Sequence, residues 1–413
     1  MSDAIESGEH ASPRTVVVIG GGQAAGWVVK TLRKEGFAGR LVMIADETHL
    51  PYERPPLSKA VLAGEADIET VRIAKPDEFA ALDIEAWQPD CASAIDRVAH
   101  TVTTRSGRTV KYDKLVIATG GAARKLPASV AKSAHVTYLR TLDEAMALGE
   151  RLRRSQRVLV VGGGWIGLEV AATARKLGVA ATVIEGAPRL CARSLPNEVS
   201  DFLLDLHRAN GVDVRLNAAL VSLEDSAEGG VRATFADGST LDADFAVAGI
   251  GLAPHTAIAE AAGIAVQDGI VVDEFGQSSD SDVFACGDVA NHPNAWLKRR
   301  VRLESWANAQ NQAIAAAKAV LGVKEPYAEI PWFWSDQYDV NLQILGDLPP
   351  DIAPVLRGNL AEKRATLFFV EDGHLRGVIA INSARDLKLA RKWMNQGRAV
   401  DVAALVDTSK ALA

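Results

Sequence analysis

The sequence has few cysteines and no long hydrophobic run. Its 413 residues include only three cysteines (Cys91, Cys191 and Cys286), which are too far apart for a CxxC pair, a zinc motif or a disulfide framework. This spacing indicates a reducing, cytoplasmic location. The uncharged run over residues 15–29 contains three consecutive glycines and is shorter than a bilayer span. Acids stand near the N-terminus where a signal peptide has Lys or Arg, so we expect neither a membrane helix nor an export signal.

The charge balance is slightly acidic. The chain has 45 basic and 52 acidic side chains, a net charge of −7, which makes it a poor general binder of nucleic acid or anionic membranes. Hydrophobic residues make up 48% of the sequence and charged residues 23%, which excludes a disordered chain, a collagen and a coiled coil. The length predicts two or three domains.

One segment of the chain is repeated. The stretch TVVVIGGGQAAG from residue 15 is echoed by RVLVVGGGWIG from residue 157. In both copies a β-branched run, typical of a buried parallel strand, meets glycines, and a helical pattern follows that ends near Gly36 or Gly178. A second apolar strand then ends in an acid, Asp46 or Glu185. Two such βαβ units predict two nucleotide-binding folds in one α/β chain.

Each repeat has the spacing of a dinucleotide-binding loop. In such loops the first glycine makes a tight turn, the second lets the backbone approach a pyrophosphate, and the third position is small so that helix and strand can pack. The helix N-terminus then presents N–H groups to the phosphates. The six residues are Gly20, Gly22 and Ala25 in the first loop and Gly162, Gly164 and Gly167 in the second. One loop alone is often a plain glycine turn, but two in the same setting predict two dinucleotide sites.

The acid after each repeat indicates which dinucleotide binds. Asp46 and Glu185 are placed to hydrogen-bond ribose hydroxyls, and an acid there repels the 2′-phosphate of NADPH. Residues 186–188 carry no charge, so we expect NADH rather than NADPH. Two sites suggest FAD in one and NADH in the other, because FAD accepts a hydride and releases electrons singly.

Further motifs give the chain a specific resemblance, which extends from about residue 14 to the C-terminal region. They are PYERPPLSK (51–59), VIATGG (116–121), LRT (139–141), GGGWIGLE (162–169), CGDVA (286–290), ESWANAQNQA (304–313) and PWFWSDQ (331–337). In this order they resemble the FAD- and NADH-dependent ferredoxin reductases of bacterial cytochrome P-450 and Rieske-type dioxygenase systems. The resemblance implies a glutathione-reductase-type fold with two Rossmann-like dinucleotide-binding domains and a C-terminal α+β domain. The expected domains are an FAD domain in two segments (13–122 and 252–326), an NAD domain (123–251) and an interface domain (327–413).

The resemblance also implies roles for individual residues. The expected FAD contacts are Gly20, Gly22, Ala24, Ala25, Asp46, Arg54, Lys59, Arg140, Asp288 and Trp334. The expected NAD contacts are Gly162, Gly164, Ile166, Gly167, Glu169 and Glu185. In catalysis Lys59 is expected beside the isoalloxazine, Glu169 beside the nicotinamide and Trp334 over the flavin edge. Asp288 is expected on the ribityl chain, with the amides at its helix start facing a flavin phosphate.

Each of these roles has a plainer alternative. Lys59 could be a solvated lysine at a helix start, but a buried Lys59 needs a carboxylate partner, for which Glu169 is the candidate. Glu169 could equally be an exposed helix acid, and Asp288 could be an N-cap. Residues 332–334, Trp-Phe-Trp, have the composition of a core strand, in which Trp332 and Trp334 share one face.

The electron acceptor is expected to be an outside protein. The disulfide reductases of this fold carry a redox cysteine pair, and the corresponding segment here, ERPPLSKAVL, has no cysteine. Electrons then leave from the flavin edge, one at a time, to two successive 2Fe–2S ferredoxins, which are acidic by the same resemblance. Basic clusters predict the docking face, with solvated helix faces as the alternative. Their residues are Lys298, Arg299, Arg300 and Arg302 in one cluster and Arg385, Lys388, Arg391 and Lys392 in the other.

Three other functions remain open from the sequence. A related flavoprotein could deliver electrons to rubredoxin, monodehydroascorbate or a quinone. A flavin-binding interaction protein of the apoptosis-inducing-factor type would share both glycine loops. An NADH oxidase fits less well, because such enzymes often use a redox cysteine. Neither a metal site nor a nucleic-acid partner is expected.

Overall fold

A computed structural model describes residues 13–412, which form two compact units. Unit 1 comprises residues 13–53, 72–121 and 254–329. Unit 2 comprises residues 54–71, 122–253 and 330–412. Each unit is therefore assembled from segments that are far apart in the sequence.

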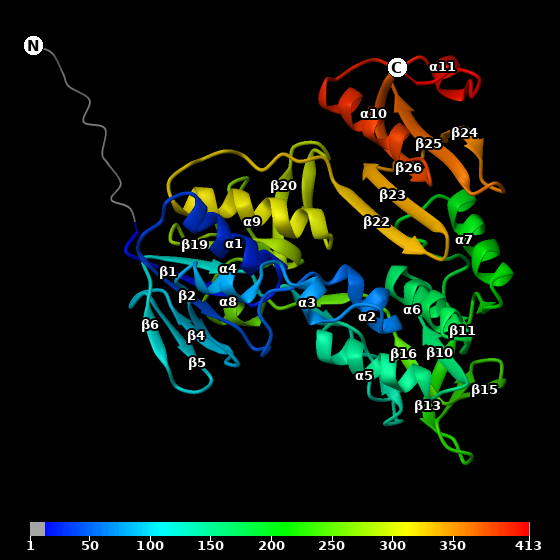
Figure 1. Ribbon diagram of the computed structural model, residues 1–413, viewed down its shortest axis with the longest axis horizontal. Coiled ribbons are helices and arrows are strands. Elements are labelled where there is room, and N and C mark those ends of the chain that lie inside the picture. Colours follow the sequence, from blue (N-terminus) through cyan, green and yellow to red (C-terminus); the bar gives the residue numbers. More distant parts are fainter. Residues whose placement is uncertain (1–12, 413) are drawn as a thin grey trace, which may run out of the picture. The chain divides into compact units, whose positions relative to one another are not determined.

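The centre of unit 1 is a five-stranded parallel sheet in the order β19-β7-β1-β2-β3. Its strands are β1 (Thr15–Ile19), β2 (Arg40–Ile44), β3 (Glu85–Trp87), β7 (Lys114–Ile117) and β19 (Val283–Ala285). Val16 and Val18 of β1 pack toward α1 (Gln23–Lys34) and α9 (Trp306–Val320), which lie side by side in Figure 1. Val17 and Ile19 pack on the opposite face, because successive side chains of a strand alternate. Burial on both faces explains the unbroken β-branched run.

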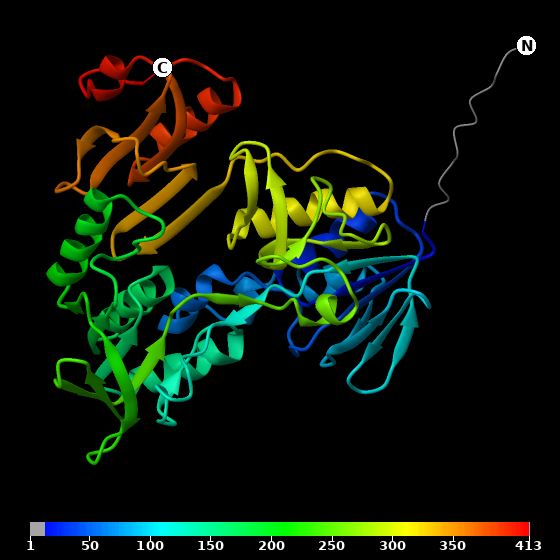
Figure 2. The ribbon, with the colours of Figure 1, turned by 180° about the vertical axis from the view of Figure 1, so that it is seen from behind.

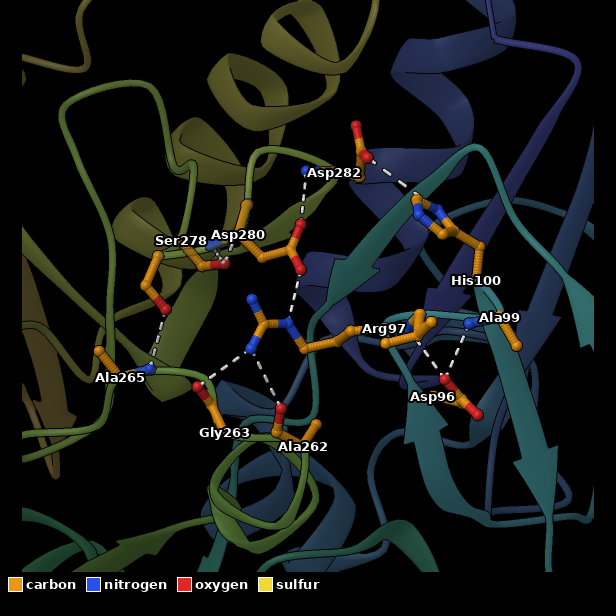
Figure 3. A network of polar contacts seen from close by, with 12 residues as sticks. Asp96, Arg97, Ala99, His100, Ala262, Gly263, Ala265, Ser278, Asp280 and Asp282 are labelled. Atoms are coloured by element: carbon orange, nitrogen blue, oxygen red, sulfur yellow. Dashed lines mark hydrogen bonds and ion pairs between the residues drawn. The ribbon is translucent and has the colours of Figure 1, made fainter.

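The opposite face of this sheet is covered by a small antiparallel sheet of β4 (Ala92–Asp96), β5 (Thr101–Thr104) and β6 (Thr109–Lys111). Arg97 follows β4 and binds Asp280 at 2.5 Å, and it also donates to the carbonyl oxygens of Ala262 and Gly263 (Figure 3). Burial opposes ionisation of Asp280, but the hydrogen bond and charge of Arg97 outweigh it and hold the pKa of that carboxyl below its usual range. The other elements of unit 1 are α4 (Pro76–Ala80), α8 (Ala257–Ala261), β18 (Ile270–Val271), η2 (Gly287–Val289), β20 (Ala290–Asn294) and β21 (Arg299–Arg302).

Unit 2 contains a second five-stranded parallel sheet, in the order β12-β11-β10-β16-β9. Its strands are β9 (Val136–Thr137), β10 (Arg157–Val161), β11 (Ala180–Ile184), β12 (Asp213–Arg215) and β16 (Phe245–Ala248). Helix α6 (Trp165–Lys176) joins β10 to β11 as α1 joins β1 to β2. The neighbouring elements are α5 (Leu142–Arg153), α7 (Asn197–Ala209), β13 (Leu220–Asp225), β14 (Val231–Phe235) and β15 (Thr240–Ala243). The two βαβ units predicted from the repeat are confirmed.

The C-terminal part of unit 2 is an antiparallel sheet in the order β22-β23-β26-β25-β24. Its strands are β22 (Trp332–Gln337), β23 (Val340–Gly346), β24 (Val355–Asn359), β25 (Arg364–Glu371) and β26 (His374–Ile381). Helix α10 (Ala384–Asn395) packs on β26 and β23, and α11 (Val402–Val406) packs on β24 (Figure 2). This is the expected C-terminal α+β part.

Residues 54–71 add three short helices to unit 2, η1 (Pro55–Ser58), α2 (Ala60–Ala63) and α3 (Ile68–Val71). Two further short strands are β8 (Gly121–Ala123) and β17 (Leu252–Pro254). These units are defined by packing alone, and the predicted domain boundaries stay a prediction. Over residues 13–412, no helix has the length and apolar character needed to cross a membrane.

Candidate functional site: two dinucleotide loops and a buried ion pair

The predicted site residues fall into two sets, one in each unit. In unit 1 the loop between β1 and α1 makes the close approaches of a dinucleotide-binding loop. Gly20 has a φ of +131°, and a Cβ there would lie 2.3 Å from the carbonyl oxygen of Ala118, so only glycine fits. Gly22 is the N-cap of α1, and no side chain caps the helix, which suits binding of a phosphate by its first turn. Ala25, at the third motif position, is fully buried.

Ala24 and Gly287 bring α1 against η2 in unit 1. Gly287 has a φ of +78°, and a Cβ there would lie 2.9 Å from the Cβ of Ala24. The Gly287 N–H donates to Gln312 Oε1 at 2.9 Å. The side chain of Gln312 on α9 therefore occupies the Gly287 amide, and the expectation that the helix-start amides face a flavin phosphate stays a prediction. Asp288 is half-buried, and the predicted contact of its carboxylate with the ribityl chain stays a prediction.

Asp46 follows the last residues of β2 and is exposed. It thus lies at the carboxyl end of a parallel strand, where the ribose-binding acid of a dinucleotide fold stands. The neighbouring Glu47 is half-buried and accepts a hydrogen bond from the Tyr52 hydroxyl.

The loop between β10 and α6 in unit 2 repeats the geometry of the first. Gly162 has a φ of +109°, and a Cβ there would lie 2.5 Å from the carbonyl oxygen of Gly249. A Cβ on Gly167 would lie 2.1 Å from the carbonyl oxygen of Gly162, whereas one on Gly164 would meet nothing within 4 Å. The turn, the open position and the tight helix–strand packing therefore fit a pyrophosphate. Ile166, in the first turn of α6, is an apolar side chain that is 44% exposed.

Glu185 directly follows β11 and stabilises this second loop. Its Oε2 accepts from the Gly163 N–H at 2.7 Å, and its Oε1 accepts from the Ala187 N–H at 2.8 Å. The next basic residue, Arg189, donates to the carbonyl oxygens of Leu195 and Ala192. The guanidinium of Arg189 is therefore occupied within unit 2. The negative charge of Glu185 then decides which ribose can bind at this loop.

Lys59 and Glu169 form the ion pair predicted from their types. Lys59 Nζ lies 2.9 Å from Glu169 Oε2, and the Glu169 side chain is only 4% exposed. Glu169 lies one turn into α6, while Lys59 follows η1. The exposed-acid alternative for Glu169 is therefore wrong. The pair lines a cavity of about 460 Å³, with Thr173, Arg175 and Tyr338 among the other residues of its wall.

Arg54 and Arg140 lie close together in unit 2. An Nη1 hydrogen of Arg54 is donated to the carbonyl oxygen of Arg140. The Arg140 N–H donates to Glu144 Oε2 at 2.7 Å, just before α5 begins. Both arginines are half-buried, and their predicted contact with FAD stays a prediction.

The aromatic residues of β22 are half-buried, so this segment is not a closed core strand. The rings of Trp332 and Trp334 stack with centroids 5.0 Å apart, which confirms that they share one face. Phe333, on the other face, packs against Trp165 at 4.9 Å, and the Arg391 guanidinium lies 5.2 Å from the Trp332 ring.

The three cysteines are free and have no role in a dithiol. Burial raises the pKa of Cys286 to about 12, and burial together with the charges of Glu185 and Glu169 raises that of Cys191 to about 12. Both thiols therefore stay protonated at neutral pH. Within residues 13–412, no group of His, Cys, Asp and Glu is arranged to hold a metal ion.

The two basic clusters differ in how their charges are used. In unit 1, Arg302 is only 10% exposed and is paired with Asp268 and Glu304, while Arg300 donates to backbone carbonyl oxygens. The exposed side chains of Arg385, Lys388 and Lys392 are spaced three and four residues apart on α10 of unit 2, and therefore share one helix face. Arg391 stands beside that face, over Trp332. Each cluster thus has three exposed cations, and in the unit 1 cluster the fourth, Arg302, is withdrawn into ion pairs.

Sequence reasoning missed the side chains that surround Glu169. Ser58 and Ser335 both donate hydrogen bonds to its carboxylate, and Gln337 and His207 extend the network. Ser58, Ser335 and Gln337 lie inside the PPLSK and PWFWSDQ motifs. Their place inside these motifs marked them as candidates, but nothing in the sequence pairs them with Glu169.

Comparison with known proteins agrees with this geometry. Residues 14–313 match the family model for pyridine nucleotide-disulphide oxidoreductases, and residues 332–413 match that for the reductase C-terminal domain. The chain is 39% identical over 397 residues to the anthranilate 1,2-dioxygenase system ferredoxin–NAD(+) reductase component of Burkholderia cepacia, which covers 96% of this chain and 98% of that protein. It is 38% identical over 400 residues to putidaredoxin reductase of Pseudomonas putida, with 95% and 94% covered.

Solved structures give the same result. The ferredoxin reductase for the CYP199A2 system from Rhodopseudomonas palustris superposes with a TM-score of 0.90 at 37% identity, over 96% of this chain and 98% of that one. The covalent putidaredoxin reductase–putidaredoxin complex gives a TM-score of 0.91 at 37% identity, over 96% and 97%. The chain belongs to the pyridine nucleotide-disulphide oxidoreductase family, and the predicted fold class is confirmed.

Proposed function

We propose that this chain is an FAD-dependent ferredoxin–NAD(+) reductase that takes electrons from NADH and passes them singly to a 2Fe–2S ferredoxin serving an oxygenase. The observation that carries this proposal is the pair of dinucleotide loops, at Gly20 and Gly162, in a chain without a redox cysteine pair. Relatives over nearly the whole length are ferredoxin–NAD(+) reductase components of dioxygenase systems, and one structural relative is in complex with putidaredoxin.

The glycine loops bind the two dinucleotides. We assign the loop of Gly20, Gly22, Ala24 and Ala25, with Asp46, to the adenosine diphosphate half of FAD, as the resemblance implies. The corresponding domains are 13–122 with 252–326 for FAD, 123–251 for NAD and 327–413 as the interface domain. When bound, FAD supplies the conversion of a two-electron hydride donor into a one-electron donor.

NADH binds at the loop of Gly162 and Gly164 beside Ile166. The Glu185 carboxylate accepts hydrogen bonds from the ribose hydroxyls of the NADH adenosine, and its charge repels the 2′-phosphate of NADPH. Arg189 is engaged with backbone carbonyls and is not available to compensate that repulsion. The reductase therefore uses NADH in preference to NADPH.

Lys59 and Glu169 act together at the reacting rings. The buried carboxylate holds the Lys59 ammonium in one place, and its positive charge would favour negative charge on a flavin bound beside it. By the resemblance, Trp334 would cover the flavin edge, and Arg54, Arg140 and Asp288 would each contact the flavin. Hydride transfer between stacked rings needs proximity and orientation rather than a general base.

The ferredoxin docks where α10 presents Arg385, Lys388 and Lys392, with Arg391 beside Trp332. A positive face steers an acidic partner and mainly raises its rate of association. Lys298 and Arg299 of the unit 1 cluster are also proposed as contacts for the ferredoxin. A cytoplasmic location stays a prediction.

An anaerobic titration tests the proposed function. One equivalent of NADH is expected to bleach the flavin absorbance of the holoprotein, and two equivalents of oxidised 2Fe–2S ferredoxin are expected to restore it. In that balance NADH becomes NAD⁺, one proton is released, and each ferredoxin gains one electron. A bleached flavin that no ferredoxin reoxidises would exclude the acceptor and favour a different member of the family.

A further inference from the structure

A continuous chain of hydrogen bonds reaches the Glu169 carboxylate from inside unit 2. Ser335 Oγ donates to Glu169 Oε1 at 2.6 Å, and Gln337 Nε2 donates to Ser335 Oγ at 3.0 Å. Gln337 Oε1 lies 2.8 Å from His207 Nε2, and the Tyr338 hydroxyl lies 3.2 Å from His207 Nδ1. Four separate side chains therefore stand in line behind one carboxylate.

The donors in this chain all point toward Glu169. Burial lowers the pKa of His207, so its ring is neutral at physiological pH and has one N–H. Because Gln337 presents its amide oxygen to Nε2, that nitrogen carries the hydrogen, and Nδ1 accepts from Tyr338. Gln337 then gives its N–H to Ser335, which leaves the single Ser335 hydrogen for the carboxylate.

The second oxygen of Glu169 is held from the other side. Glu169 Oε2 accepts from the Ser58 hydroxyl and from Lys59 Nζ. The carbonyl oxygen of Ser58 is itself tied to α6, because it accepts from Thr173 Oγ1 at 2.8 Å. The carboxylate thus lies between residues 58–59 and β22, two segments that approach α6 from distant parts of the sequence.

The carboxylate, the two hydroxyls that donate to it and Gln337 behind them are buried, whereas the Lys59 side chain is 22% exposed. The exposed fractions are 4% for Glu169, 2% for Ser58, 1% for Ser335 and 2% for Gln337. A buried carboxylate that loses a donor reorients or takes up water, and its partner ammonium moves with it. The position of the Lys59 ammonium therefore depends on the hydroxyls that hold Glu169. One of these, that of Ser335, comes from the C-terminal sheet.

We propose that Ser335, oriented by Gln337 and His207, is a positioning residue for hydride transfer: it fixes the Glu169 carboxylate and, through it, the Lys59 ammonium. This inference rests on the proposed function only for the half-reaction between NADH and bound FAD. It gives the C-terminal sheet a part in that half-reaction besides any part in meeting a ferredoxin.

The test compares Ser335→Ala with a matched control, Thr366→Val. Thr366 is also fully buried in the same sheet, and its hydroxyl also donates to a carboxylate, that of Asp386 at 3.1 Å. Each holoenzyme is mixed rapidly with NADH without oxygen, and the limiting rate of flavin reduction is separated from the dissociation constant of NADH. A misplaced catalytic group costs up to about 100-fold in rate, so we expect a loss of roughly 10-fold in Ser335→Ala with a change in NADH affinity below about twofold. Thr366→Val is expected to keep the parent rate. Ser335→Thr, which retains a hydroxyl, is expected to keep most of the parent rate.

A double-mutant cycle shows whether Ser335 acts through Glu169. In a Glu169→Gln background, Ser335→Ala is expected to lower the limiting rate by less than about twofold, because the group it positions is already altered. A loss in that background equal to the loss in the parent would overturn the proposal, as would a parent-like rate for Ser335→Ala.

A labelling experiment gives a readout that does not depend on turnover. Lys59 is acylated with an amine-reactive ester, and the modified peptide is followed by mass spectrometry. Labelling is expected to be several-fold faster in Ser335→Ala than in the parent and unchanged in Thr366→Val; equal labelling in all three would refute the positioning role. If NADH fails to reduce the parent flavin, the proposed function and this inference both fall, whereas a flavin that NADH reduces but no ferredoxin reoxidises removes only the acceptor.

Discussion

Replacing Gly167 with alanine tests the second dinucleotide loop most sharply. The added Cβ would lie 2.1 Å from the carbonyl oxygen of Gly162, whereas a carbon and a carbonyl oxygen normally stay about 3.3 Å apart or more. The first turn of α6 must therefore move by roughly 1 Å relative to β10. Such overpacking costs about 1–3 kcal/mol of folding free energy. The same shift moves the amides that are expected to hold the NADH pyrophosphate, and the loss of one hydrogen bond to a charged group weakens binding about 10-fold or more.

Gly164→Ala is the matched control for this change. Gly164 has an extended backbone conformation, φ −87° and ψ −178°, and a Cβ there would meet no protein atom within 4 Å. We expect the thermal midpoint of the holoenzyme to fall in Gly167→Ala and to stay within about 1 °C of the parent in Gly164→Ala. NADH binding, followed by the quenching of its fluorescence, is expected to weaken in both variants.

The two variants separate packing from ligand contact. Parent-like NADH affinity in Gly164→Ala would show that the open position of the loop does not face the dinucleotide. Parent-like stability in Gly167→Ala would show that the close approach between α6 and Gly162 is not rigid. Either result would refute the reasoning from the loop geometry.

Four further predictions follow from the two units. The ratio of kcat/KM for NADH to that for NADPH is expected to exceed about 10, because Glu185 repels a 2′-phosphate; a preference for NADPH would contradict it. Trp334→Ala is expected to retain FAD but to slow electron delivery to the cognate ferredoxin, and unchanged ferredoxin-dependent turnover would argue against its role. Lys388→Glu on α10 is expected to lower the rate of ferredoxin reduction, and the parent rate is expected to fall with added salt; a rate that ignores both changes would exclude docking there. Burial and the charge of Arg300 lower the pKa of His292 to about 4. As the pH falls, the His292 imidazole is therefore protonated in the unfolded chain before it is protonated in the folded one. The free energy of unfolding is expected to decrease by up to about 3 kcal/mol between about pH 6.5 and 4. Unfolding midpoints measured across that range are expected to fall less in His292→Phe, and parallel curves for the variant and the parent would be inconsistent with this shift.

The local features of the fold were predictable from the sequence because they repeat at short range. The β-branched runs at Val16 and Val158, the glycines after them and the acid after the next strand each depend on a few adjacent residues, and the structure places two parallel sheets accordingly. The ion pair of Lys59 and Glu169 was also predictable, because an ammonium withdrawn from solvent requires a carboxylate and Glu169 of the GGGWIGLE motif was the candidate.

The partners of that ion pair were not predictable, for a physical reason. Ser335 and Glu169 are 166 residues apart, and no hydrophobic period or motif spacing encodes a contact at that distance. The contact between Gln312 and the Gly287 amide shows the same limit, since Gln312 lies on α9, 25 residues from Gly287. Tertiary packing brings these residues together, and the identities of the residues alone do not show which of them will meet.

Electron transfer from NADH to a separate iron–sulfur protein is the central claim. Its most direct test is the rate at which the purified holoenzyme reduces cytochrome c with NADH, measured with and without a 2Fe–2S ferredoxin. The rate is expected to be low without ferredoxin and to rise with its concentration to a plateau. Slow NADH oxidation that no ferredoxin in a panel accelerates would contradict the claim.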